Sequence, residues 1–214
     1  PKPEALVCFR DGLPIDERLT RIDEELIPQG RAAKLPELTS SLRAEVFRYF
    51  PAEKAALEPE WSDTVTAQGR TIRRVSFTSF DGLRVRGIYS LPADSTAKLP
   101  ALLVVDERKG IRVWGNEQPL ERNQWGNRAV LIVETIDRGT RALEQNLRSF
   151  TDDDALHHMK RQAMVMGTTL ESMQVYEVLR SLELLRSLPE VDASRITITG
   201  KSEAGINGLY AVLL

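Results

Sequence analysis

A serine between small residues lies near the end of the 214-residue chain, in the run Gly200-Lys201-Ser202-Glu203-Ala204-Gly205. Residues 196–199 before it have the composition of a strand, and residues 204–214 open a helix. A strand, a sharp turn that contains a serine and a helix together form a nucleophile elbow. Small residues two before and two after the serine let strand and helix approach closely, and here these are Gly200 and Ala204, where glycine is usual. The run therefore predicts that the hydroxyl of Ser202 is exposed on a strained turn.

Two other structures could use the same residues. Gly200-Lys201-Ser202 matches the end of a phosphate-binding loop, but that motif requires glycine at position 195, where the chain has Arg195. The residues between are strand-like, and backbone amides cannot form a phosphate cradle inside a strand. Alternatively, Ser202 belongs to a structural turn and caps the following helix. The phosphate loop is disfavoured, whereas the helix-cap interpretation remains open.

A serine nucleophile requires a base at neutral pH. The two histidines, His157 and His158, are adjacent in a predicted helix, where neighbouring side chains point in different directions, so at most one can face Ser202. Their simplest interpretation is a polar helix face. A metal site would require a spacing of four on the helix and further ligands, so we expect no metal and no cofactor.

Composition and charge exclude several classes of function. The net charge of −2 gives no attraction to nucleic acid or an anionic membrane, and no apolar run approaches the ~20 residues of a membrane span. The one cysteine, Cys8, excludes an internal disulfide and a thiolate zinc cluster. No signal peptide is present, but the chain begins at Pro1, and export with removal of a signal peptide is one explanation. We expect a soluble protein without nucleic-acid or membrane partners, and its compartment is unknown.

The elements around the serine predict an α/β sheet with an antiparallel N-terminal hairpin. Residues 1–70 are expected to form an arm and two helices, from about Ile15 and Glu37, that cover the core. Within 71–214, Asp81-Gly82 separates two alternating runs and predicts the hairpin. The apolar runs predict parallel neighbouring strands, with a helix packed on one face of their sheet. These strands are expected near 101–105, 129–134 and 195–199, and the helix at 169–188.

Three phrases of the chain resemble the α/β-hydrolase superfamily, in particular its acetyl xylan esterase and prolyl oligopeptidase-like branch. One runs from Leu185 to Ile196, with Pro189-Glu190-Val191-Asp192 at its centre, and leads into the elbow. The second is the hairpin from Asp81 to Tyr89, and the third is the loop Asp137-Arg138-Gly139. They occur in the family's order. The resemblance implies that residues 71–214 are the N-terminal part of an α/β-hydrolase domain, truncated after the elbow helix.

The resemblance also implies a role for each matched position. Ser202 would attack the carbonyl of a small-molecule or carbohydrate ester, and the backbone N–H of Glu203 would be one oxyanion donor. The second donor would come from the loop after strand 101–105, with the backbone of Arg108 as the candidate. The family's acid and histidine follow the serine. We therefore expect them, with the remainder of the hydrolase domain, C-terminal to Leu214, and this chain alone has no recognisable catalytic acid or histidine.

Departures from the family's pattern leave two hypotheses open. The loop at 106–110 reads Asp-Glu-Arg-Lys-Gly where the family usually has a His-Gly phrase, and Glu203 places a carboxylate near the oxyanion. These features favour a non-catalytic scaffold or binding domain with the same fold. The intact Gly200-x-Ser202 favours a serine hydrolase, a carboxylesterase or acetyl xylan esterase-like enzyme that acts through a Ser202 acyl-enzyme.

Overall fold

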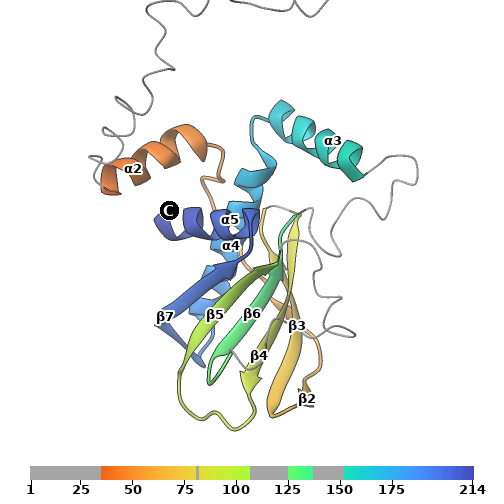
Figure 1. Cartoon of the computed structure of the whole chain (residues 1–214), viewed down its shortest axis with the longest axis vertical. Helices are drawn as coiled ribbons and strands as arrows, with labels where there is room; N and C mark the ends of the chain where they lie inside the picture. The colour runs from red at the N-terminus through yellow and green to blue at the C-terminus, as the bar shows by residue number, and fades with distance from the viewer. Residues whose placement is uncertain (1–34, 81, 107–124, 137–151) are drawn as a thin grey trace, which may run out of the picture. The chain divides into compact units, whose positions relative to one another are not determined.

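The computed structural model describes residues 35–80, 82–106, 125–136 and 152–214 (Figure 1). The chain divides into two compact units, residues 1–42 and 43–214. In the first, the described residues form α2 (Leu35–Ser41), and the π-helical turn η4 (Leu42–Val46) follows it. The helix predicted from Glu37 is therefore confirmed, whereas the one predicted from Ile15 lies outside the described residues.

The described part of the second unit contains a seven-stranded sheet in the order β1-β3-β4-β6-β5-β7, with β2 also paired to β3 (Figure 1). The strands are β1 (Glu60–Trp61), β2 (Val65–Ala67), β3 (Arg70–Thr78), β4 (Arg84–Pro92), β5 (Leu99–Asp106), β6 (Ala129–Glu134) and β7 (Val191–Gly200). β3 and β4 form the predicted antiparallel hairpin, and β4 pairs antiparallel with β6. β5 pairs parallel with both β6 and β7, which confirms the predicted parallel neighbours.

Three helices accompany the sheet: α3 (Asp152–Val165), α4 (Leu170–Ser187) and α5 (Glu203–Leu213). α4 begins after Thr169, whose Oγ1 accepts a hydrogen bond from the N–H of Ser172 at 3.0 Å. It packs against β5, β7 and α5, as predicted for helix 169–188. Every residue of β6 is buried, because the strand lies inside the sheet and both of its faces are covered.

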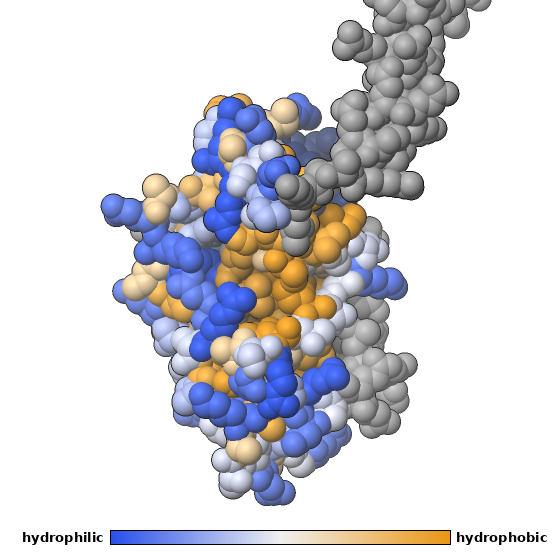
Figure 2. All heavy atoms as spheres, turned by 90° about the vertical axis from the view of Figure 1, so that its left-hand side faces the viewer, coloured by the Kyte–Doolittle hydropathy of each residue, from blue (hydrophilic) through white to orange (hydrophobic). Residues whose placement is uncertain are grey.

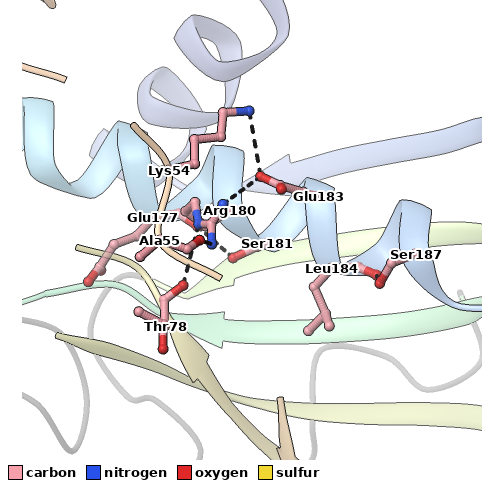
Figure 3. A network of polar contacts seen from close by, with 9 residues as sticks. All are labelled: Lys54, Ala55, Thr78, Glu177, Arg180, Ser181, Glu183, Leu184 and Ser187. Atoms are coloured by element: carbon pink, nitrogen blue, oxygen red, sulfur yellow. Dashed lines mark hydrogen bonds and ion pairs between the residues drawn. The ribbon is translucent and has the colours of Figure 1, made fainter. Parts of the chain in front are cut away.

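A buried arginine fixes the chain that precedes the sheet to α4 (Figure 3). Arg180 is 1% exposed. It donates from Nε to the carbonyl oxygen of Thr78 at 3.4 Å and from Nη2 to that of Ala55 at 2.5 Å. Its Nη1 pairs with Glu183 Oε2 at 2.7 Å, and Lys54 approaches the same oxygen at 3.6 Å. The charge is thus compensated, as a buried guanidinium requires.

The sequence phrase that precedes the elbow forms an irregular start of β7. Leu99 pairs with Val191 and Ala101 pairs with Ile196, so the four residues 192–195 of β7 lie opposite the single residue Pro100 of β5, and three of them are extra. Asp192 closes this bulge: Oδ1 accepts from the N–H and hydroxyl of Ser194 at 3.0 and 2.7 Å, and Oδ2 accepts from Arg195 Nε at 2.6 Å. These bonds, first that of the Ser194 hydroxyl and then that of Arg195, lower the pKa of Asp192 to about 2.

Candidate active site

The backbone of Ser202 is strained at the turn between β7 and α5. Its φ of 53° and ψ of −125° lie in a region that residues other than glycine rarely adopt. The carbonyl oxygen of Ser202 accepts the first N–H groups of the helix, those of Gly205 at 3.1 Å and Ile206 at 3.3 Å. The side chain makes no capping hydrogen bond and is exposed. Ser202 therefore occupies the N-cap position, but its hydroxyl does not cap the helix, so the helix-cap interpretation fails. The geometry is typical of a nucleophile elbow.

The turn can form because strand and helix backbones almost touch. A Cβ added to Gly200 would lie 2.7 Å from the carbonyl carbon of Ala204 and 2.8 Å from the nitrogen of Gly205. A Cβ added to Gly205 would lie 2.8 Å from the carbonyl oxygen of Gly200. The side chain of Ala204 is buried, so its methyl group fits where glycine was expected. The close approach depends on Gly200 and Gly205, and the importance of Gly205 was not recognised from the sequence.

One of the two predicted oxyanion donors lies among the described residues. Glu203 is the first residue of α5, so its backbone N–H belongs to the helix N-terminus, beside Ser202 and at the positive end of the helix dipole. The second candidate, Arg108, lies outside the described residues. The parallel register places Val105 beside Gly200 and Asp106 beside Glu134. The end of β5, where the predicted donor loop begins, is thus a neighbour of the elbow.

The histidines do not supply a base in the described part of the chain. His157 and His158 are both exposed on α3, which packs against α4. Neither hydrogen-bonds to Ser202, whose hydroxyl has no hydrogen-bond partner among the described residues. Within these same residues, no three His, Cys, Asp or Glu side chains group as a metal site. In the described part of the chain, no helix is long and apolar enough to cross a membrane.

Three buried polar side chains connect the elbow helix to the end of β6. Asn207 of α5 donates from Nδ2 to Gln174 Oε1 at 2.9 Å, and Gln174 Nε2 donates to the carbonyl oxygen of Ile136 at 3.0 Å. Glu177 Oε2 accepts from the N–H of Ile136 at 2.5 Å. These three residues were not predicted from the sequence. The signal in the sequence is that Gln174, Glu177 and Ser181 lie three and four residues apart, and so on one side of a helix.

In the described part of the chain, no other element packs on a surface beside the elbow, formed by β7 and α5. β7 is the last strand of the sheet, so its outer edge has no strand partner there. On α5, the side chains of Ile206, Leu209 and Val212 are 55%, 61% and 67% exposed. Figure 2, which views the side on which β7 and α5 lie, shows apolar side chains gathered on it. An open strand edge next to apolar side chains is typical of a surface that binds further polypeptide.

Comparison with known proteins identifies relatives of the whole sheet domain. Residues 51–212 match the sequence profile of the acetyl xylan esterase (AXE1) family. No curated protein matches the chain. Among solved structures, a Bacteroides fragilis protein that has been suggested to be an acetyl xylan esterase superposes with a TM-score of 0.66 at 13% identity over 83% of this chain and 49% of its own.

Two further solved structures support the same fold. The acetyl xylan esterase of Paenibacillus sp. R4 gives a TM-score of 0.57 at 21% identity, over 81% of this chain and 53% of its own. A glucuronoyl esterase of Solibacter usitatus gives 0.55 at 16% identity, over 86% of this chain and 55% of its own. The chain therefore spans about half the length of the esterases that it matches.

Proposed function

Because the chain belongs to the acetyl xylan esterase family of α/β-hydrolases, we propose that it is the N-terminal part of a serine hydrolase that cleaves esters through Ser202. The observation behind this proposal is the backbone strain at Ser202 together with its exposed, uncapped hydroxyl at the start of α5. Backbone strain of this kind costs on the order of 1–3 kcal/mol, and residues that have it cluster at active sites and ligand-binding sites. A structural turn would gain stability from a capping hydroxyl, which this turn lacks.

The proposed reaction begins with attack of the Ser202 oxygen on the ester carbonyl carbon, while a base removes the hydroxyl proton. The carbonyl oxygen becomes an oxyanion, and the N–H of Glu203, next to Ser202 at the start of α5, is proposed to donate to that oxygen. Collapse breaks the bond to the alcohol, which leaves with a proton and gives an acyl-enzyme on Ser202. Water then hydrolyses the acyl-enzyme. The second oxyanion donor is proposed to be the backbone of Arg108.

The substrate is proposed to be a small carboxylic ester or an acyl group on a carbohydrate. This follows from the family, whose name specifies acetyl groups on xylan, a carbohydrate. The structures of similar fold include an acetyl xylan esterase and a methylesterase, so proteins with this fold act on more than one ester. An acyl group on a hydroxyl is the chemical feature that the Ser202 reaction needs.

The catalytic acid and histidine are proposed to lie in the remainder of the hydrolase domain, C-terminal to Leu214. Ser202 requires a base, and the described residues offer none to its hydroxyl. The open edge of β7 and the exposed Ile206, Leu209 and Val212 form a surface on which this remainder would pack. We propose that it covers this surface and places the base above Ser202.

A second candidate function is a non-catalytic scaffold or binding domain that kept the fold. The observation in its favour is Glu203, whose exposed carboxylate lies in the first turn of α5, next to the proposed oxyanion position. A negative charge there stabilises the helix through its dipole but opposes a developing oxyanion. In that case the strained serine would have no chemical role.

One substitution separates the two candidates in the full-length polypeptide that contains these residues. Under the esterase proposal, Ser202→Ala abolishes labelling by a fluorophosphonate probe and lowers turnover of 4-nitrophenyl acetate by several orders of magnitude. Ser95→Ala removes another exposed serine hydroxyl, in the turn after β4, and should change neither. Turnover that survives Ser202→Ala in a folded protein would contradict the esterase proposal. A wild type that shows neither labelling nor turnover would support the scaffold.

A further inference from the structure

The buried face of α5 contains one polar residue. The four buried residues of the helix are Ala204, Asn207, Gly208 and Ala211. The alanines and the glycine allow a close approach to the sheet: a Cβ on Gly208 would lie 3.0 Å from Cγ2 of Ile198. Small side chains interlock little with their neighbours, so they leave the rotation and axial position of a helix weakly defined. A directional contact is needed to define them, and Asn207 makes one.

Asn207 is the first member of a chain of hydrogen bonds that ends at Ile136, two residues after β6. Its amide nitrogen donates to Gln174 on α4, and the amide nitrogen of Gln174 donates to the carbonyl oxygen of Ile136. That carbonyl can only accept, which fixes the orientation of the Gln174 amide. Glu177 accepts from the N–H of the same residue. The peptide groups of Ile136 are therefore held from both sides by two side chains one turn apart on α4.

The polar side chains of this hydrogen-bond chain are buried, which indicates that they do more than fill space. Gln174, Glu177 and Asn207 are each at most 5% exposed. Apolar side chains of similar volume could fill this space without any polar group to satisfy. A buried polar contact instead fixes one arrangement among several that an apolar interface would allow. This contact joins α5, which follows Ser202 directly, to the segment just after the carboxyl end of β6.

We propose that Gln174 and Asn207 are positioning residues that orient Ser202 through α5. Asn207 follows Ser202 by five residues, about 7 Å along a rigid helix. A rotation or slide of α5 at Asn207 therefore moves the serine hydroxyl by a similar amount. The Asn207–Gln174–Ile136 bonds hold α5 at one rotation relative to β6, and β6 lies beside β5, whose end adjoins the elbow. The part of this inference that concerns turnover rests on the proposed function.

The test uses two single variants, their combination and a matched control in the full-length polypeptide. Gln174→Met keeps the volume of the side chain and removes both of its hydrogen bonds, and Asn207→Ala removes the same link from the other side. Ser181→Ala is the control, because it removes a buried hydrogen bond of α4, from Oγ to the carbonyl oxygen of Glu177 at 2.7 Å, that does not reach α5. The readouts are kcat and KM for 4-nitrophenyl acetate and native-state hydrogen exchange of residues 203–210.

For both single variants we expect kcat to fall about 10- to 100-fold with KM changed less than twofold, because a misplaced nucleophile affects the reaction more than substrate binding. Exchange of 203–210 should accelerate in both and remain unchanged in Ser181→Ala. The double variant should lose no more than the worse single variant, since both remove one link. Equal effects of all three single substitutions, or additive losses in the double variant, would overturn the inference.

The exchange measurement keeps this inference separate from the proposed function. If Ser202→Ala leaves turnover intact, the esterase proposal fails, but faster exchange of 203–210 in Gln174→Met would still show that Gln174 fixes α5. If Ser202→Ala abolishes turnover while Gln174→Met and Asn207→Ala exchange like wild type, the esterase proposal stands and the positioning role is refuted. Where Gln174→Met fails to fold, Asn207→Ala decides the outcome by the same two readouts.

Discussion

The serine and its neighbours show how four residues create an exposed hydroxyl. Ser202 has a positive φ, which requires the surrounding backbone to hold it in place. Gly200 and Gly205 allow that, because any Cβ on either would lie within 2.8 Å of backbone atoms. The N–H of Glu203 follows at once, as the first residue of the helix. The proposed nucleophile and the proposed oxyanion donor therefore belong to the same turn.

This geometry predicts different results for two similar substitutions. Gly200→Ala places a methyl group 2.7 Å from the carbonyl carbon of Ala204, and backbone cannot rotate away as a side chain can. We expect a loss of about 1–3 kcal/mol in the free energy of unfolding. Gly208→Ala meets a side-chain methyl group rather than backbone, Cγ2 of Ile198 at 3.0 Å, and gains helix propensity of about 1 kcal/mol. Urea denaturation of both variants measures the contrast, and equal midpoints would show that the turn is not tight.

The polar residues of the interior show where prediction from the sequence ends at this scale. Ser202 was identified because a turn of small residues between strand and helix is a local pattern. Gln174, Asn207 and Arg180 were missed because a polar residue on a helix is usually solvated, and its burial depends on elements distant in the chain. Arg180 contacts Ala55 and Thr78, more than 100 residues earlier. No spacing within helix 170–187 indicates those partners.

At the scale of elements, apolar runs made the central strands predictable. β5 and β6 are buried on both faces, so their sequences are continuous apolar runs without alternating polar residues. The hairpin of β3 and β4 was predicted by its alternation. β1 and β2 were missed because they have two and three residues, too few for any period to show. The bulge of β7 was present in the sequence only as part of a family phrase, and its hydrogen bonds now explain why Asp192 and Arg195 belong together.

The bulge gives a prediction about pH. The folded pKa of Asp192 is about 2, below the unfolded value of about 3.9, so its contribution to stability is present above pH 4 and is lost as pH falls toward 2. Asp192→Asn should therefore lower the urea midpoint at pH 7, and the gap to wild type should narrow at pH 3. Asp94→Asn alters an exposed carboxylate in the turn after β4 and serves as the control. A gap that stays constant from pH 7 to pH 3 would contradict the role of the carboxylate in closing the bulge.

At the scale of the molecule, the two edges of the sheet differ. β1 and β2 pair with β3 at one end, whereas β7 at the other end has no outer partner in the described part of the chain. This open edge belongs to the strand that leads into α5, whose exposed Ile206, Leu209 and Val212 form an apolar stripe. Ser202 lies between them, at the junction of β7 and α5. A polypeptide that completed the sheet at β7 would therefore also reach the serine, which links completion of the fold to the supply of a base.

This arrangement predicts that one substitution affects stability differently in two forms of the protein. In the isolated 214-residue chain, Leu209 is 61% exposed, so Leu209→Lys should leave the free energy of unfolding nearly unchanged and reduce self-association through the apolar face. In the full-length polypeptide, where we propose that the stripe is covered, the same substitution should cost at least about 2 kcal/mol, the value of burying a leucine side chain. Sedimentation velocity and urea denaturation measure the two effects.

Val65→Lys provides the matched control, because Val65 is also about as exposed, at 60%, but lies on β2 at the far end of the sheet. It should be tolerated in both forms. If Leu209→Lys is tolerated as well as Val65→Lys in the full-length polypeptide, then α5 remains exposed there, and the base for Ser202 must reach the elbow by a route that does not cover this helix. If it destabilises only the full-length form, the surface beside the elbow is the one on which the rest of the hydrolase domain packs.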